Sequence, residues 1–163
     1  MYAEALKPIT DTMRKFPGVW DLPDAAGADK IKRLTIEVRT ALNLTLPDEY
    51  IKFLKECDGL EFDGYIIYGT NNFLENQADY EYISKQYIIF AEYDIGWFGM
   101  KKSDGSFWEL DKPSGREMQQ FLCAGEGISY LRQLIEQMID GGGQNERTQF
   151  QLIWKTIQII SYD

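Results

Sequence analysis

The chain of 163 residues contains no histidine, and this absence excludes several kinds of enzyme site. Histidine is the commonest general base and the commonest metal ligand, so Ser-His-Asp and Cys-His nucleophiles are excluded. The chain also lacks a glycine-rich phosphate loop ending in Lys-Ser or Lys-Thr, a Gly-x-Gly-x-x-Gly run, a Cys-x-x-Cys pair and the spacing of a calcium loop. We therefore expect no catalytic residue, no metal site and no cofactor.

Carboxylates are the groups that remain for chemistry. Glu92 with Asp94, or Asp104 with Glu109, could form the two-carboxylate site of a glycosidase, which needs carboxyl groups roughly 5–10 Å apart. No sugar-binding pattern accompanies either pair. A carbohydrate-active enzyme is therefore a weaker hypothesis than a binding protein.

Long apolar runs and long basic clusters are also lacking. No stretch approaches the ~20 apolar residues that a membrane-spanning helix needs. The N-terminal segment does not have the basic-then-apolar layout of a signal peptide. The basic clusters at residues 30–33 and 101–102 are too short to indicate phosphate binding. We expect a cytoplasmic protein that binds neither a membrane nor nucleic acid directly.

Cysteine is scarce, with two residues in the chain. Cys57 and Cys123 are isolated, and each falls on an apolar pattern, which favours buried free thiols. The sequence also allows a disulfide between them.

The length is that of one domain with a core that needs no disulfide or metal to hold it together. Helical patterns occur at both ends and strand patterns between them. This order predicts an α+β fold, with a single mixed or mainly antiparallel sheet and helices packed against it. We expect one domain over residues 1–139, with its core at about 28–139.

Helices are expected over about residues 6–16 and after residue 28. In the second of these, Ile31, Leu34 and Val38 recur at helical spacing, and Asp29 is the expected N-cap. The capping side chain would satisfy backbone N–H groups that the first helical turn leaves free.

The sharpest local pattern is the run LPDEYIKFL at residues 46–54. Thr45 and Asp48 approximate a capping box at its start. The apolar side chains of the run share one helical face. Gly59 is expected to end this helix in a left-handed conformation.

Strands are expected at residues 65–68, 87–90, 96–101 and 106–110, where β-branched and aromatic residues gather. Asp104-Gly105, between the last two strands, predicts a hairpin. Residues 73–85 fit either a short helix or an ordered loop.

The C-terminal part begins with an amphipathic helix expected over residues 128–138. Residues 140–145 form a glycine-rich connector. Residues 146–163 are apolar, and their spacing favours a helix, although a terminal strand is also open. This segment either docks on its own domain or serves in oligomerisation.

Residues 46–54, closed by Asp58-Gly59, resemble the signature of the SUKH superfamily, which includes the fungal cell-wall-synthesis regulator and many bacterial immunity proteins. The order of helix, Asp-Gly, strands, hairpin and closing helix is similar over about residues 28–139. The chain departs from the family in its apolar tail at 146–163 and in Asp58, where Asn is frequent. The resemblance implies an α+β domain that binds another protein.

The charge of the chain is concentrated in its middle. Residues 48–111 carry 14 acidic and 5 basic side chains, and they hold 15 of the 23 aromatic residues. Carboxylates steer encounter with a basic partner, and aromatic side chains supply anchors for binding. The alternative is that the aromatic residues fill the core of the sheet while the acids solvate its outer surface.

The resemblance implies an antidote that binds and neutralises a cognate bacterial toxin domain, often a nuclease or a deaminase. A toxin that holds phosphates presents Lys and Arg, to which an acidic surface is complementary. The alternative is a non-enzymatic regulatory adaptor or scaffold with a host protein partner. Asp58 has a second interpretation at the helix end, and Trp97 and Trp108 have one in the core. The residues expected to bind the partner are Asp58, Glu61, Asp63, Glu92, Tyr93, Asp94, Trp97, Asp104, Trp108 and Glu109.

Overall fold

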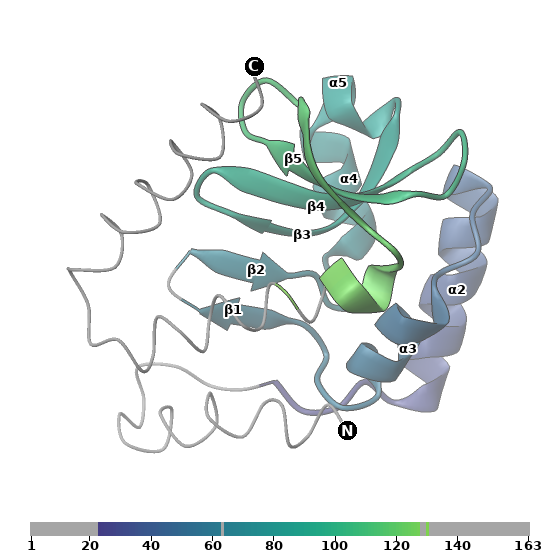
Figure 1. Ribbon diagram of the computed structural model, residues 1–163. Coiled ribbons are helices and arrows are strands. Elements are labelled where there is room, and N and C mark those ends of the chain that lie inside the picture. The colour runs from purple at the N-terminus through teal and green to yellow at the C-terminus, as the bar shows by residue number, and fades with distance from the viewer. Residues whose placement is uncertain (1–22, 63, 128–129, 131–163) are drawn as a thin grey trace, which may run out of the picture.

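The computed structural model describes residues 23–62, 64–127 and 130 (Figure 1). Four helices and six strands have assigned bounds in this part of the chain. In chain order they are α2 (Ala28–Leu42), α3 (Asp48–Leu54), β1 (Leu60–Phe62), β2 (Tyr65–Ile67), α4 (Phe73–Asp79), α5 (Glu81–Ser84), β3 (Tyr87–Tyr93), β4 (Gly96–Lys101), β5 (Phe107–Asp111) and β6 (Glu117–Phe121).

The six strands form one antiparallel sheet in which each strand pairs with its neighbour in sequence. The predicted α+β fold with helices against a mainly antiparallel sheet is confirmed. Every residue of β3 is buried, as are five of the six residues of β4. Both faces of the central strands are therefore covered.

Aromatic side chains cover the two faces of the sheet. Phe90 of β3 lies against Tyr50 of α3 and Phe73 of α4, with ring centroids 5.0 and 5.3 Å apart. Trp97 of β4 lies 5.1 Å from the ring of Tyr80, at the junction of α4 and α5. Phe98 follows Trp97 on the strand and therefore points to the opposite face. The aromatic residues of the middle segment thus supply much of the core.

The starts of α2 and α3 differ from the sequence expectation. Gly27 is the N-cap of α2, and Asp29 lies within its first turn without a capping hydrogen bond. Pro47 is the N-cap of α3, so the predicted capping box of Thr45 and Asp48 is wrong. Asp48 instead stands in the first turn of α3, where a negative charge complements the helix dipole.

The Asp58-Gly59 pair locks two backbone segments together after α3 has ended at Leu54. The Asp58 carboxylate accepts hydrogen bonds from the backbone N–H of Thr70 at 2.6 Å and from its hydroxyl at 2.8 Å. Gly59 has φ +90°, and a Cβ there would lie 2.8 Å from the Gly69 nitrogen. Only glycine fits this close approach without strain.

Two strands were not expected from the sequence. β1 spans three residues, which is too short for a periodic pattern. β6 has the sequence EMQQF, in which polar side chains are more numerous than the strand-forming types. Pairing with β5, from Phe107↔Phe121 to Leu110↔Glu117, places this segment in the sheet. Residues 73–85 form α4 and α5, the helical one of the two alternatives.

The side chain of Gln77 on α4 completes the hydrogen bonding of β3 beyond the end of β2. Its Nε2 donates to the Ile89 carbonyl at 2.7 Å, and its Oε1 accepts from the Ile89 N–H at 2.9 Å. The pairing of β2 with β3 ends just before this point, where the Tyr68 N–H donates to the Phe90 carbonyl. The amide of Gln77 therefore holds α4 on the sheet.

Cys57 is buried and Cys123 is exposed, and both are free thiols. The expectation of a buried thiol is confirmed for Cys57 and wrong for Cys123, because Cys123 follows the exposed Leu122 in the turn after β6. None of the helices in the described ranges has the length and apolar character needed to cross a membrane. The helices expected at 6–16 and 128–138 and the tail at 146–163 lie wholly or mainly outside the described residues.

Candidate partner-binding surface

Four of the ten residues expected to bind a partner are buried. Glu92, Tyr93, Trp97 and Glu109 expose 9%, 8%, 2% and 3% of their surface. The carboxylates of Glu92 and Glu109 and the hydroxyl of Tyr93 form hydrogen bonds within this chain, whereas Trp97 Nε1 is buried with no hydrogen-bond partner among the described residues. In this conformation they support the surface rather than form it.

Glu92 stands at the centre of a polar cluster beneath the turns that join the strands. It accepts hydrogen bonds from the Tyr80 hydroxyl at 2.5 Å and from Lys112 Nζ at 2.7 Å. The ammonium of Lys112 also lies 5.6 Å from the ring centre of Trp97, as in a cation–π contact. Burial acts to raise the pKa of Glu92, but the hydrogen bonds from Lys112 and Tyr80 outweigh it and hold that pKa below 4.5. The charges of Glu92 and Lys112 thus neutralise each other.

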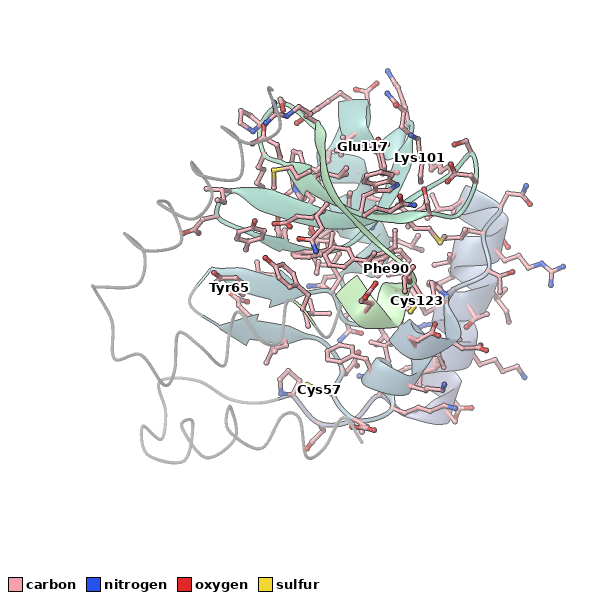
Figure 2. All side chains as sticks on the ribbon, in the orientation of Figure 1. Cys57, Tyr65, Phe90, Lys101, Glu117 and Cys123 are labelled. Carbon is pink, nitrogen blue, oxygen red and sulfur yellow. The ribbon has the colours of Figure 1, made fainter. Side chains whose placement is uncertain are left out.

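Glu109 has a different environment. The hydroxyl of Tyr93 donates a hydrogen bond to its carboxylate. Among the described residues no ion pair forms at Glu109, and burial raises the pKa of its carboxyl group. The ring of Tyr93 stacks on that of Tyr65 of β2, with centroids 5.4 Å apart; Tyr65 is labelled in Figure 2. The contacts of Tyr93 with Glu109 and with Tyr65 therefore link β2, β3 and β5 inside the fold.

Asp58 serves the fold as well, through Thr70 and through an ion pair with Lys30 Nζ at 3.3 Å. Glu61, Asp94 and Asp104 are exposed, and Trp108 is half-buried. Asp63 lies outside the described residues.

The structure does not bring all the exposed acids together. Asp94 is in the turn between β3 and β4, whereas Asp104 is in the hairpin between β4 and β5, at the other end of the sheet. Figure 1 shows these turns on opposite sides of the molecule. The two turns lie at opposite ends of β4, and a strand of this length separates them by about 17 Å at ~3.3 Å per residue.

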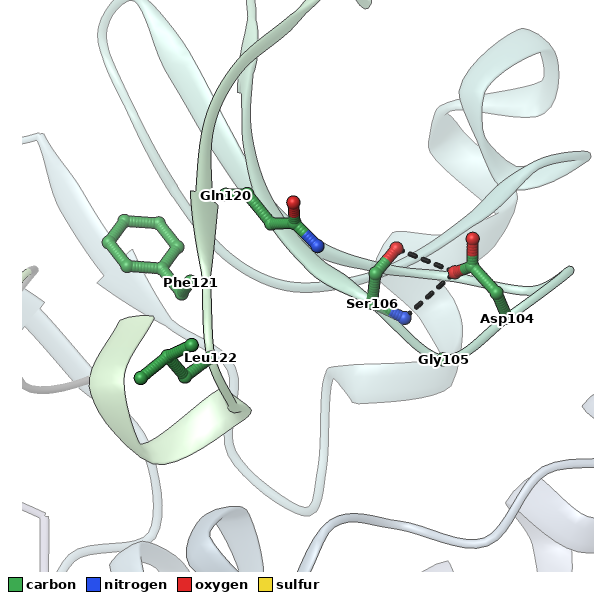
Figure 3. Close-up of a pocket in the computed structure, with 6 residues that line it drawn as sticks. All are labelled: Asp104, Gly105, Ser106, Gln120, Phe121 and Leu122. Atoms are coloured by element: carbon green, nitrogen blue, oxygen red, sulfur yellow. Dashed lines mark hydrogen bonds between the residues drawn. The ribbon is translucent and has the colours of Figure 1, made fainter.

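The end that carries Asp104 has mixed charge. Asp104 accepts hydrogen bonds from the N–H and the hydroxyl of Ser106, and Trp108 Nε1 donates to the same hydroxyl at 2.7 Å. An open hollow of about 580 Å³ lies beside them, between the hairpin and β6 (Figure 3). A second hollow, of about 340 Å³, is lined by Lys85, Gln86, Lys101, Lys102 and Ser103.

Lys101 at this end pairs with Glu117 of β6 at 2.5 Å, and both side chains are labelled in Figure 2. The Tyr87 hydroxyl also donates to Glu117. The hydrogen bond from Lys101 is the main reason that the pKa of Glu117 lies below its ordinary value. Glu117 is therefore bound within the sheet.

The opposite end gathers three turns. Asp94 approaches the β1–β2 turn so closely that a Cβ on Gly64 would lie 2.6 Å from its Oδ1. The Lys112 N–H of the β5–β6 turn donates to the Ile95 carbonyl at 2.9 Å. The Tyr82 hydroxyl of α5 donates to the Pro113 carbonyl at 2.7 Å. We call the exposed side chains of Tyr82, Asp94, Ile95 and Pro113 the turn face.

Two members of the turn face, Tyr82 and Ile95, are large apolar side chains that expose 51% and 54% of their surface. Neither was expected from the sequence. The sequence feature that could have identified Ile95 was its position as an apolar residue in the turn between two strands. Tyr82 gave no signal, because its place beside the turns depends on how α5 packs against Trp97.

Comparison with known protein families shows which family the chain belongs to. The model of the SMI1 / KNR4 family (SUKH-1) matches residues 35–130, more than half of the chain. The chain belongs to the SUKH-1 family. The match covers α3 and all six strands of the described sheet. The resemblance to the SUKH superfamily is thereby confirmed. No curated protein matches the chain.

In this SUKH-1 chain the residues of the 46–54 run act in folding. Leu46, Tyr50, Phe53 and Leu54 are all buried, and the Tyr50 hydroxyl donates to the Tyr68 carbonyl at 2.5 Å. Among the described residues, no group of three or more acidic or cysteine side chains is arranged to hold a metal ion.

Proposed function

We propose that this SUKH-1 protein is an immunity protein, which binds and neutralises a cognate bacterial toxin domain without catalysing a reaction. The observation that carries the proposal is the family match over residues 35–130, because the SUKH superfamily includes many bacterial immunity proteins. The toxin domain is a basic nuclease or deaminase in this proposal. The protein acts in the cytoplasm, where such a toxin meets its substrate.

The charge of the chain supports a basic partner. The net charge is −9, and Glu61, Asp94 and Asp104 are exposed acids of the strand-rich middle. A toxin that cleaves or edits nucleic acid binds phosphates with Lys and Arg. Opposite charges raise the association rate above the ~10⁵–10⁶ M⁻¹s⁻¹ of a neutral pair, so that the toxin is captured before it acts.

Growth rescue tests this proposal. Each protein domain encoded next to this chain's gene is expressed from an inducible promoter, alone and together with the chain. We expect one of these domains to stop growth when expressed alone, and we expect co-expression of the chain to restore growth. A catalytically inactive form of the same domain, which should be harmless alone, is the control.

Two results would contradict the immunity function. If none of the neighbouring domains stops growth, or if the chain protects against none of them, the immunity function is refuted. A stable partner with no toxic activity would favour the regulatory adaptor.

A further inference from the structure

We infer that the turn face is the surface that contacts the toxin domain, and that the toxin presents an apolar pocket for Ile95 beside a lysine or arginine for Asp94. This inference rests on the proposed function and adds the binding surface and the chemistry of the partner. It also differs from the sequence expectation, which placed buried residues in the interface.

The apolar part of the turn face has the exposure that an interface anchor needs. Ile95 and Tyr82 each expose about half of their surface, and Pro113 between the turns is exposed as well. Side chains that fill a partner's pocket at the centre of an interface dominate binding energies, and tyrosine is enriched among them. Polar turn residues would have been the ordinary choice at the tip of a hairpin.

Contacts of Lys112 beneath the turn face hold its turns together. The Lys112 N–H fixes the Ile95 carbonyl, while its ammonium reaches Glu92 at 2.7 Å and the Tyr93 carbonyl at 3.3 Å. The same ammonium lies over the rings of Tyr80 and Trp97. One lysine thus ties the β5–β6 turn to the β3–β4 turn. A surface that is ordered before binding loses less conformational entropy when it binds.

The exposed carboxylates around the turn face favour a basic group of the partner on the side of β1 and β2. Lys112 is paired with Glu92, so its charge does not cancel that of Asp94. Glu61 of β1 is a second exposed acid at this end of the sheet. Arg116, which is exposed, lies on the β6 side. The complementary toxin therefore places its cation over Asp94, on the side of β1 and β2, and away from Arg116.

Matched substitutions test this assignment. Ile95→Arg and Asp94→Lys change the turn face. Ile36→Arg and Glu37→Lys on α2 are the controls, since Ile36 is 56% exposed and Glu37 is an exposed acid. Each control introduces the same change of charge as its counterpart, at a place away from the turn face.

The probe is the inactivated toxin domain found by growth rescue, and the measurement is its dissociation constant by calorimetry for each variant. We expect Ile95→Arg to weaken binding about 30-fold or more and Asp94→Lys about 10-fold. Both controls should stay within about 3-fold of the unmodified chain. Thermal unfolding checks that each variant is folded, and Tyr82→Ala replaces any turn-face variant that is not.

The outcomes separate the inference from the proposed function. If the unmodified chain restores growth but the turn-face variants bind as tightly as the controls, the inference is overturned and the immunity function stands. If the unmodified chain rescues growth against no neighbouring domain, the proposed function fails, and the inference fails with it.

Discussion

Glu92 and Glu109 are two buried glutamates of the same sheet whose surroundings shift their pKa values in opposite directions. Glu92 receives hydrogen bonds from a lysine and a tyrosine, which hold its pKa below 4.5 despite burial. For Glu109, burial outweighs the single hydrogen bond from Tyr93, and its pKa is raised above 4.5. The two residues therefore make opposite contributions to the pH dependence of folding.

Lys112→Met should destabilise the protein, because it leaves the Glu92 carboxylate buried without its cation. We expect a loss of about 2–3 kcal/mol in the free energy of unfolding at pH 7, measured by urea denaturation. The ionised form of Glu92 stabilises the fold above pH ~4.5, and this contribution is lost as the pH falls through the lowered pKa. The lost stability should accordingly be smaller at pH 3 than at pH 7. Equal losses at both pH values would contradict this role of the pair.

Glu109→Gln should have the opposite effect at neutral pH. Glutamine keeps an acceptor for the Tyr93 hydroxyl and removes a charge that burial disfavours. We expect a gain of about 1 kcal/mol at pH 8. The gain should shrink toward pH 4, because stability from this group falls as the pH rises from about 4.5 through the raised pKa. Destabilisation at pH 8 would show instead that the ionised carboxylate has a favourable partner.

At the scale of elements, Gln77 offers a direct test of how α4 is held on the sheet. Gln77→Met keeps the length of the side chain but removes both hydrogen bonds to Ile89. We expect a loss of about 1–3 kcal/mol and faster hydrogen exchange at the Ile89 amide, since that N–H loses its acceptor. The Tyr68 amide, which donates to the Phe90 carbonyl, is the internal control. Unchanged protection at Ile89 would refute the role of Gln77.

The helix α3 carries the family motif into the core. Phe53 is 1% exposed, so Phe53→Ala should cost about 3–5 kcal/mol through lost burial and the cavity that remains. Ile36→Ala on the exposed face of α2 should change stability by less than about 0.5 kcal/mol. Thermal unfolding of both variants gives the comparison. A Phe53→Ala protein with unchanged melting behaviour would contradict the placement of this ring.

The elements differ in how far the sequence alone could specify them. The stripe of Ile31, Leu34 and Val38 and the Asp-Gly hairpin are local signals, and both elements formed where they were expected. β6 depends on pairing with β5, a tertiary interaction that no local pattern of EMQQF contains. The capping box failed because Pro47 itself occupies the N-cap position of α3.

At the scale of the whole molecule, the sequence located a segment rich in acids and aromatic residues but could not divide it into surface and interior. As acidic residues, Glu92 and Glu109 would be expected at the surface, yet each is buried beside a tyrosine. Ile95 has the opposite outcome, because it is an apolar residue that the turn leaves exposed. Burial is decided by packing across strands and from α5, and the charge pattern does not contain that information.

Inhibition of a toxin is the property on which the proposed function of the protein depends. The decisive measurement is a titration of the catalytic activity of the purified toxin domain with the purified chain, at low and at physiological salt. We expect activity to fall to zero at about one equivalent of the chain, with faster association at low salt because opposite charges attract. Full toxin activity in the presence of excess chain, for every neighbouring domain that stops growth, would contradict the immunity function.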